Sequence, residues 1–436
     1  MRILDWDTLD SGQRRAALAR PQLQSLPEVT RVAREVIASV RQSGDEALHC
    51  LTRRFDAVEL DALSVAPAEF AQARRALARG QIAALERALA NVHAFHAAQL
   101  PQPLALDIEP GVRCEQLLRP LSAVGLYVPA GSAPLPSTVI MLAVPARIAA
   151  CPTRVLCTPP ARDGRAHPAV LVAAELCGVD TVFKVGGAQA IAALAYGTHS
   201  IPRVDKIFGP GNAWVTAAKQ LVANDPLGAA CDLPAGPSEV LVIADASARA
   251  DFVAADLLAQ AEHDPLAQAL LVTNSRQLAV RVAQALTSAL PGLARRPILE
   301  QSLAACRCIL VPELDTALAV ANEYAPEHLL LQVREPRHWL PQVRNAGAVF
   351  LGAWSPEPLG DYCTGPNHVL PTYGYARSLS GLSVRDFVKT ITVQEVSPAG
   401  LSALGPTAVT LAQLEGLDAH AQAVTRRLGA LTGLGP

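Results

Sequence analysis

Hydrophobic and polar residues follow two different periods along this chain, and the change between them falls near residue 121. Residues 25–44 and 68–96 place apolar side chains about every 3.6 positions, which predicts amphipathic helices. The first of these segments ends at a glycine, a common helix stop. The last 60 residues return to the helical period, most clearly over 410–433.

Between these helical ends, short runs rich in β-branched and apolar residues alternate with alanine-rich helical segments. Nine such runs are expected to be strands: 122–129, 154–160, 181–187, 206–211, 239–245, 269–273, 308–312, 328–333 and 348–352. Strands that alternate with helices predict parallel sheets covered by helices. We therefore expect the α/β class, with two incomplete Rossmann-like α/β domains whose sheets are mainly parallel.

Two such α/β units fit between residues 26 and 376, flanked by small helical segments at both ends of the chain. The expected division is a helical segment over 1–25, a discontinuous first α/β domain over 26–126 and 238–376, a second α/β domain over 127–237, and a C-terminal segment over 377–436. No internal sequence repeat is visible.

Composition narrows the class of protein. Of 436 residues, 50% are hydrophobic and 17% are charged, and the net charge of −2 gives no support for a nucleic-acid partner. No apolar run reaches the roughly 20 residues of a membrane span. The first 15 residues lack the apolar core of a signal peptide. Nine scattered cysteines with no CxxC pair indicate reduced thiols, so we expect a cytoplasmic protein without a membrane partner.

Lysine is rare in this chain. Only four of the 37 basic residues are lysine, namely Lys184, Lys206, Lys219 and Lys389. Where arginine is the default cation, a lysine can mark a place that needs a compact ammonium group. Three of the four lie close to two glycine-rich segments.

Those two segments, FKVGGAQAIAALAYG (183–197) and KIFGPGNAWVTAAK (206–219), each read as strand, glycine turn and helix. Backbone N–H groups at such a turn can bind a phosphate. Neither segment contains GxGxxG, so nucleotide binding and simple tight turns both remain open.

Several polar residues stand at the ends of the predicted elements. In LLAQAEHD (257–264), Gln260 and His263 lie three residues apart and share one helix face. The pair is either half of a metal site or the polar end of a helix. His93 and His96 have the same spacing, and we interpret them as surface histidines. Spacing alone therefore does not identify a metal site.

Four further motifs contain candidate residues. Ser238 follows a Pro/Gly turn before a predicted strand, and the adjacent Glu327 and His328 precede another. A carboxylate beside an imidazole can transfer protons, although such a dipeptide is also common in solvated turns. Asp361 lies in a Gly/Pro-rich loop suited to holding a ligand, and His368 in the same loop is expected to be structural. Glu415 and His420 are five apart, so on one helix they would face different ways.

Taken in order, the motifs of this chain resemble those of the histidinol dehydrogenase family over essentially its whole length. The matching segments are YVPAG, FKVGGAQAIAALAYGT, DKIFGPGNAWVTAAK, PAGPSEVLVIAD, QAEHD, NEYAPEHL, GDYCTGPNHVLPT and SGLSVRDFVKT. The resemblance implies oxidation of L-histidinol to L-histidine through L-histidinal, with reduction of two NAD⁺. It also implies a homodimer, one zinc ion per subunit, and terminal segments that take part in dimerisation.

The same resemblance implies roles for individual residues. The zinc ligands would be Gln260, His263, Asp361 and His420, with His420 and Glu415 contributed across the dimer interface. The substrate would contact these four residues together with Ser238, His328 and Glu415. His328 would be the general base and Glu327 its partner in the second oxidation. NAD would contact Tyr127, Gln189 and Asn212.

The chemistry of these residue types agrees with the implied reaction. Histidine, aspartate and amide ligands suit Zn²⁺, with Mn²⁺ or Co²⁺ as substitutes, and zinc can fix a substrate at its imidazole and amine nitrogens. The unusual glycine turns predict weak NAD binding. Two other functions use the same residues: a zinc hydrolase in which Glu327 activates water, and a metal-dependent binding protein without catalysis. Only the dehydrogenase requires NAD⁺.

Overall fold

The computed structural model describes residues 1–21, 26–130, 133–234 and 236–433. Its chain forms two compact units, one of residues 1–99 and 121–387 and the other of residues 100–120 and 388–436. Parts of the expected N-terminal segment and of the YVPAG and PAGPS motifs fall outside the described residues. Within the described residues, none of the helices has both the length and the apolar character that crossing a bilayer requires.

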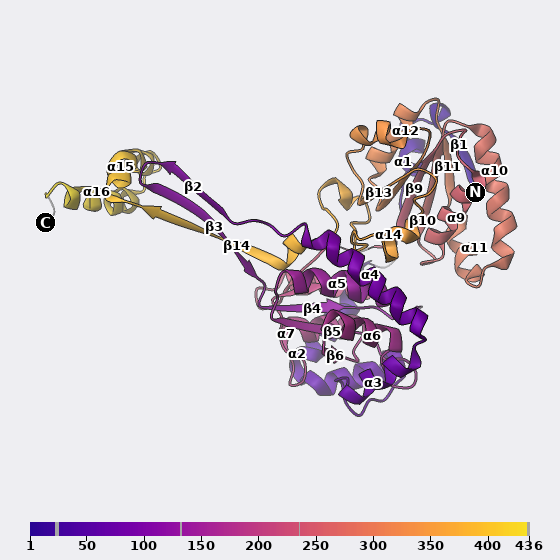
Figure 1. Ribbon diagram of the computed structural model, residues 1–436, viewed down its shortest axis with the longest axis horizontal. Helices are drawn as coiled ribbons and strands as arrows, with labels where there is room; N and C mark the ends of the chain where they lie inside the picture. The colour runs from indigo at the N-terminus through magenta and orange to yellow at the C-terminus, as the bar shows by residue number, and fades with distance from the viewer. Residues whose placement is uncertain (22–25, 131–132, 235, 434–436) are drawn as a thin grey trace. The chain divides into compact units, whose positions relative to one another are not determined.

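The first sheet of the larger unit has six parallel strands (Figure 1). In spatial order they are β1 (Arg2–Asp5), β11 (Arg307–Leu310), β10 (Gln268–Thr273), β9 (Glu239–Ala244), β12 (His328–Gln332) and β13 (Ala348–Leu351). Five of them coincide with expected strands. The edge strand β1 was not expected, because its four residues stand alone at the chain end and their partner is about 300 residues away.

Both faces of this sheet are buried, as continuous apolar strands predict. Val240 and Val242 on one face pack with helices α9 (Ala250–Ala261), α10 (Arg276–Ala289) and α11 (Arg296–Ala304). Leu241 and Ile243 on the other face pack with α12 (Leu314–Tyr324) and with residues of the N-terminal segment that includes α1 (Ser11–Ala17). The shorter elements of this part are η1 (Trp6–Thr8), η2 (Leu290–Gly292), α13 (Pro336–Trp339), η3 (Leu340–Gln342), α14 (Glu357–Tyr362), η4 (Tyr375–Arg377) and η5 (Val384–Phe387).

The second sheet has five strands, again all parallel. Their order is β6 (Thr181–Phe183), β5 (Thr153–Cys157), β4 (Ala123–Tyr127), β7 (Lys206–Phe208) and β8 (Ala230–Cys231). The accompanying helices are α2 (Leu26–Asp56), α3 (Pro67–Ala76), α4 (Arg79–Ala97), α5 (Pro136–Ile148), α6 (Pro168–Cys177), α7 (Gly187–Tyr196) and α8 (Ala213–Ala223). The expected α/β class with parallel-rich sheets is confirmed.

Helix α2 packs in the core of the second sheet. Its Val36 and Leu48 belong to the same buried cluster as Val155 of β5 and Ile191 of α7. The expected division places residues 26–126 in the first α/β domain, whereas in the structure α2 packs against the second sheet. Amphipathic periodicity shows which face of a helix is buried but not what that face packs against. The expected stop at Gly44 is a kink within α2, where the glycine has φ 52°. The other boundaries of the expected division stay predictions.

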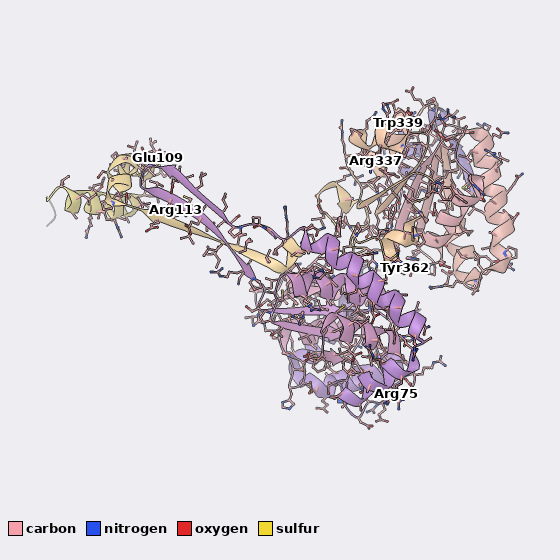
Figure 2. The ribbon with its side chains drawn as sticks, in the orientation of Figure 1. Arg75, Glu109, Arg113, Arg337, Trp339 and Tyr362 are labelled. Atoms are coloured by element: carbon pink, nitrogen blue, oxygen red, sulfur yellow. The ribbon has the colours of Figure 1, made fainter. Side chains whose placement is uncertain are left out.

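The smaller unit is a three-stranded antiparallel sheet with two helices. It contains β2 (Leu104–Glu109), β3 (Val112–Pro120), β14 (Val388–Val396), α15 (Pro398–Leu414) and α16 (Asp418–Leu431). Figure 2 labels Glu109 and Arg113 on the β2–β3 hairpin. Residues 100–120 were expected to be outside the C-terminal segment, and the structure pairs them with it.

Candidate active site

Glu327 and His328 lie at the amino edge of the first sheet. His328 is the first residue of β12 and stands in register with Val240 of β9 and Ala348 of β13. Glu327 directly precedes the strand, and both side chains are buried, with 6% and 3% exposure. A buried acid beside a buried imidazole does not fit the solvated-turn interpretation of this dipeptide.

Helix α9 runs back across the sheet and ends at the same edge. Gln260 lies in its last turn and is fully buried, whereas His263 follows the helix end and is exposed. The backbone N–H of His263 donates to the carbonyl oxygen of Gln260 at 3.2 Å. The structure thus brings this pair to the edge occupied by His328, with one residue on the helix and the other in the turn after it.

A short helix, α14, adds two carboxylates to this edge. Glu357 and Asp361 are four residues apart and so share one helix face. Ligand atoms of His263, Glu357 and Asp361 all lie within 4.8 Å of one another. Asp361 was expected here, but Glu357 was missed. The four-residue spacing of the two acids in EPLGD could have indicated Glu357. That signal depends on a helix, and the sequence predicts a loop there.

Three carboxylates surround the imidazole of His328. Its Nδ1 lies 3.6 Å from Glu327 Oε2 and 3.9 Å from Glu357 Oε1, and its Nε2 lies 3.4 Å from Asp361 Oδ1. Burial opposes the charged ring, but these carboxylates outweigh it and raise the pKa of His328 to about 10. Burial also raises the pKa of Glu327 to about 8 and that of Glu357 to about 8, against the attraction of His328.

The carboxamide of Gln260 has one orientation that satisfies its neighbours. With the amide turned so that its nitrogen faces inward, that nitrogen donates to Glu357 Oε1 at 3.2 Å, to the carbonyl oxygen of Glu239 at 3.1 Å and to His328 Nδ1 at 3.1 Å. The amide oxygen is then free of these acceptors. Because an amide oxygen is a metal ligand and an amide nitrogen is not, this orientation makes Gln260 competent to bind a cation.

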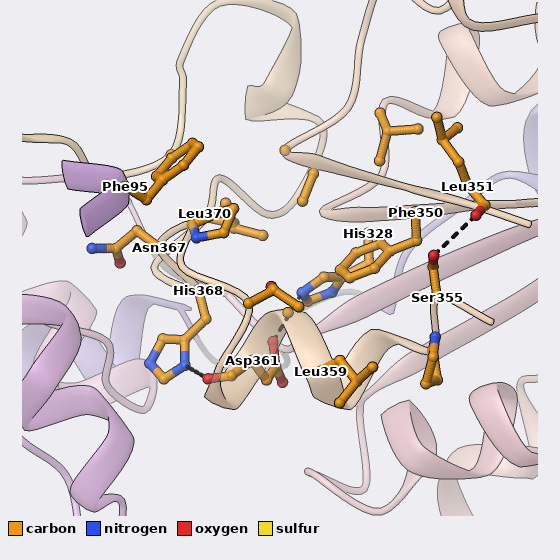
Figure 3. Close-up of a pocket in the computed structure, with 18 of the residues that line it drawn as sticks. Phe95, His328, Phe350, Leu351, Ser355, Leu359, Asp361, Asn367, His368 and Leu370 are labelled. Carbon is orange, nitrogen blue, oxygen red and sulfur yellow. Dashed lines mark hydrogen bonds and ion pairs between the residues drawn. The ribbon is translucent and has the colours of Figure 1, made fainter. Parts of the chain in front are cut away.

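A cavity of about 650 Å³ opens beside this cluster (Figure 3). His328, Phe350 and Asp361 line it, as do Asn367 and His368. His368 Nδ1 lies 2.7 Å from the carbonyl oxygen of Asp361, so this histidine supports the backbone of a site residue, in agreement with the structural role expected for it.

The two histidines of α4 differ from each other. His93 is exposed, as expected, but His96 is completely buried, so its interpretation as a surface residue was wrong. Its Nε2 lies 3.3 Å from Asn367 Nδ2, in the loop that lines the cavity. The spacing of the pair gave no indication of this, because the partner lies more than 270 residues away.

The three residues expected to contact NAD lie at the carboxyl edge of the second sheet. Tyr127 ends β4, Gln189 lies in the first turn of α7, and Asn212 caps α8, with its side chain accepting the N–H of Val215. The Tyr127 hydroxyl accepts the backbone N–H of Gly187 at 3.0 Å. In parallel α/β folds this edge is where nucleotides bind.

The lysines near these glycine turns make specific contacts. Lys219 Nζ donates to the carbonyl oxygen of Gly209 at 2.9 Å and pairs with Asp232, whose other oxygen accepts the N–H of Gly209 at 2.7 Å. Lys184 pairs with Glu69 at 3.2 Å. Each contact uses a compact ammonium in a confined place, as the rarity of lysine suggested.

The sequence profile of the histidinol dehydrogenase family matches residues 19–428. The chain is 55% identical over 430 residues to the histidinol dehydrogenase of Xanthomonas euvesicatoria pv. vesicatoria, covering 98% of this chain and 99% of that one. It belongs to the histidinol dehydrogenase family. The family's enzyme from Vibrio vulnificus (strain YJ016) is 52% identical over 432 residues, covering 99% of both chains. The crystal structure of histidinol dehydrogenase from Elizabethkingia anophelis superposes with a TM-score of 0.95 at 40% identity, covering 99% of both chains.

Membership of this family of oxidoreductases confirms the resemblance of the motifs. The larger unit brings together Gln260, His263, Asp361 and the Glu327–His328 pair. Ser238 precedes β9 and is partly buried, and its carbonyl oxygen accepts the N–H of Gln268 at 3.0 Å.

Glu415 and His420 belong to the smaller unit, at the junction of α15 and α16, and both are exposed. Glu415 caps the end of α15, the chain turns at Gly416 with φ 71°, and His420 lies in α16, so the angle expected on a single helix does not apply. Their participation in a site stays a prediction.

Proposed function

We propose that this chain catalyses the two-step oxidation of L-histidinol to L-histidine through L-histidinal, with NAD⁺ as the oxidant and zinc as the resident metal, in the last steps of histidine biosynthesis. The observation that carries the proposal is the buried Glu327–His328 pair beside Gln260, His263 and Asp361, in a chain of this family. The name of the Xanthomonas relative supports the substrate.

The residues at the amino edge of the first sheet fit a zinc ion. One imidazole, a carboxylate and a correctly turned amide are suitable ligands. Glu357 Oε2 and His328 Nε2 are buried and have no hydrogen-bond partner, which is costly unless a ligand or ion satisfies them. We assign Gln260, His263 and Asp361 as ligands from this chain. When bound, the ion supplies a fixed positive charge that draws the imidazole and amine nitrogens of the substrate.

His328 is the base in this proposal, and it must be neutral to accept a proton. The raised pKa of His328 arises from uncompensated carboxylates. A divalent cation held by Gln260, His263 and Asp361 would offset the charge of these carboxylates and would lower the pKa of His328 towards neutrality, where a histidine base works best. Neutral His328 then takes the hydroxyl proton as hydride leaves the substrate for NAD⁺. In the second oxidation, Glu327 takes one proton from the water that adds to the aldehyde carbon. His328 takes the remaining hydroxyl proton as the second hydride leaves for a second NAD⁺, which gives the carboxylate.

Tyr127, Gln189 and Asn212 form the NAD contacts in this proposal, at the carboxyl edge of the second sheet. The turns at this edge, FKVGG and FGPGN, both lack the GxGxxG fingerprint. They therefore present fewer backbone N–H groups to a pyrophosphate. We therefore infer weak NAD⁺ binding in the absence of substrate. Isothermal titration checks this, and a dissociation constant in the low micromolar range or tighter counts against it.

We also propose a homodimer in which His420 supplies the fourth zinc ligand, and Glu415 a substrate contact, to the partner subunit. The support is an exposed apolar surface around these two residues. Leu411, Leu414 and Leu417 are 55%, 79% and 40% exposed, which is unusual for a surface without a partner.

Subunit exchange tests the shared site. A His420→Ala homodimer and a His263→Ala homodimer each lack a ligand at both sites, whereas one site of the mixed dimer is complete. Recovered activity after mixing supports the proposal. No recovery after verified exchange shows that His420 acts within its own subunit.

One assay tests the reaction itself. NADH absorbance is followed with histidinol, with and without a chelator, and then after zinc is restored. We expect two NADH per histidinol, loss of activity on chelation and recovery with Zn²⁺. Hydrolysis without NAD⁺ would identify a zinc hydrolase instead, and histidinol binding without turnover would identify a binding protein. The nine free cysteines are consistent with the cytoplasm as the place of this reaction.

A further inference from the structure

Glu239, the first residue of β9, holds both members of the Glu327–His328 pair through its backbone. Its N–H donates to Glu327 Oε2 at 2.8 Å, and its carbonyl oxygen lies 3.1 Å from His328 Nδ1. The backbone of one residue therefore contacts both the acid and the base of the pair.

The side chain of Glu239 is fully buried and is held by Arg20 of the N-terminal segment. Arg20 Nε donates to Glu239 Oε1 at 2.5 Å, and Arg20 Nη2 donates to Glu239 Oε2 at 2.8 Å. This two-point pairing fixes the plane of the carboxylate as well as its place. The backbone N–H of Tyr373 also donates to Glu239 Oε1, at 2.9 Å.

Arg20 also contacts the turn that precedes Glu327 in the chain. Its Nη2 donates to the carbonyl oxygens of Tyr324 at 2.9 Å and of Ala325 at 3.4 Å, and its guanidinium lies 3.9 Å from the centre of the Tyr324 ring. Ala325 has φ 54°, a left-handed conformation that a residue with a Cβ adopts only when neighbours hold it there. This turn ends α12 and leads directly into Glu327.

We propose that Arg20 is a positioning residue for the reaction: it joins the start of β9 to the turn before β12 and so fixes Glu327 and His328 relative to each other. Arg20 itself contacts neither member of the pair in any described hydrogen bond, and it acts through Glu239 and the Tyr324–Ala325 backbone. A lysine could not replace it, because one ammonium cannot pair at two points with a carboxylate and also stack on a ring. The inference rests on the proposed function for its assay.

The experiment compares steady-state histidinol oxidation by the full-length wild type and Arg20→Met, with zinc content measured on both. A displacement of catalytic groups by about 1 Å costs on the order of 100-fold in rate, so we expect kcat to fall by about that factor. KM for histidinol is expected to stay within about threefold and zinc near the wild-type content, since Arg20 contacts no proposed ligand. In Arg20→Ala, added methylguanidine is expected to restore part of kcat by occupying the vacated space.

Arg307→Met is the matched control. Arg307 Nη1 donates to the carbonyl oxygens of Ala16, Ala17 and Ala19, at 3.1, 2.6 and 3.2 Å, so it ties the same N-terminal segment to the sheet without touching Glu239. We expect kcat of Arg307→Met to stay close to that of the wild type. An equal loss in both variants would show that docking of the segment, and not the Glu239 contact, is what matters.

Unchanged kcat in Arg20→Met, or failure of methylguanidine to restore folded Arg20→Ala, overturns the proposal. If Arg20→Met does not fold, Arg20→Lys takes its place, and wild-type kcat in that variant overturns it equally. A wild-type chain that forms no NADH contradicts the proposed function, whereas an active wild type with an unaffected Arg20→Met contradicts the positioning role alone.

Discussion

The Lys219–Asp232 ion pair connects the stability of the second sheet to the proposed NAD contacts. Both side chains are almost fully buried, at 6% and 2% exposure, and together they hold the N–H and the carbonyl oxygen of Gly209. Gly209 follows β7 with φ 126°, and a Cβ there would lie 2.1 Å from the carbonyl oxygen of Tyr127. The pair therefore fixes a turn that has no room to shift towards β4, three residues before Asn212.

Lys219→Met removes one partner and leaves Asp232 as an uncompensated buried carboxylate. Breaking a buried pair in this way costs about 3–5 kcal/mol. Burial already raises the pKa of Asp232 in the intact pair, so in the variant this group takes up a proton to avoid the full cost. We expect the urea midpoint of unfolding to fall accordingly, and KM for NAD⁺ to rise by about tenfold, equivalent to about 1.4 kcal/mol.

Two comparisons make this prediction refutable. The double variant Lys219→Met/Asp232→Asn removes the unpaired charge, so it should regain about 2 kcal/mol of the loss. Lys184→Met is the matched control, because the Lys184–Glu69 pair is more exposed, at 10% and 19%, and should cost about 1 kcal/mol. A wild-type midpoint for Lys219→Met, or a double variant no more stable than the single one, would refute the reasoning.

Three further results are expected. His328→Asn should lower the rates of both oxidations by about 100-fold or more with zinc content near normal, measured by NADH formation from histidinol and from histidinal. Glu327→Gln should impair histidinal oxidation more than histidinol oxidation, and a loss confined to the alcohol step would contradict the assigned roles. Burial raises the pKa of Asp256 to about 7 from 3.8, so the folded chain keeps a proton that the unfolded chain releases, and stability falls between about pH 4 and pH 7. Asp256→Asn should therefore be more stable than the wild type at pH 8, by as much as about 4 kcal/mol, and equal near pH 4, as unfolding midpoints at both pH values will show.

The sequence predicted those elements whose own residues carry a clear period. All nine expected strands are present, because each is a short apolar run in a parallel sheet. Strand β2 does alternate, with Leu104, Leu106 and Ile108 on one face, yet it was missed among the polar residues around it. Strand β14 mixes exposed threonines and charges with valines, so it has no single buried face to detect.

Within the site, the sequence identified the residues whose chemistry is visible in a motif and missed those that act through tertiary contacts. Asp361 and the Glu327–His328 pair were expected and meet at one sheet edge. Glu357 and Arg20 were not expected. Arg20 contacts a carboxylate 219 residues away, and local spacing contains no information about a contact of that range.

The confinement of the lysines has a practical consequence for chemical labelling. Lys184 and Lys219 are buried and ion-paired, and Lys206 donates to the carbonyl oxygen of Asp386 at 3.2 Å. Lys389, on β14 of the smaller unit, is the one exposed lysine of the four. Amine-reactive dyes and crosslinkers should therefore react with Lys389 much faster than with the other three lysines.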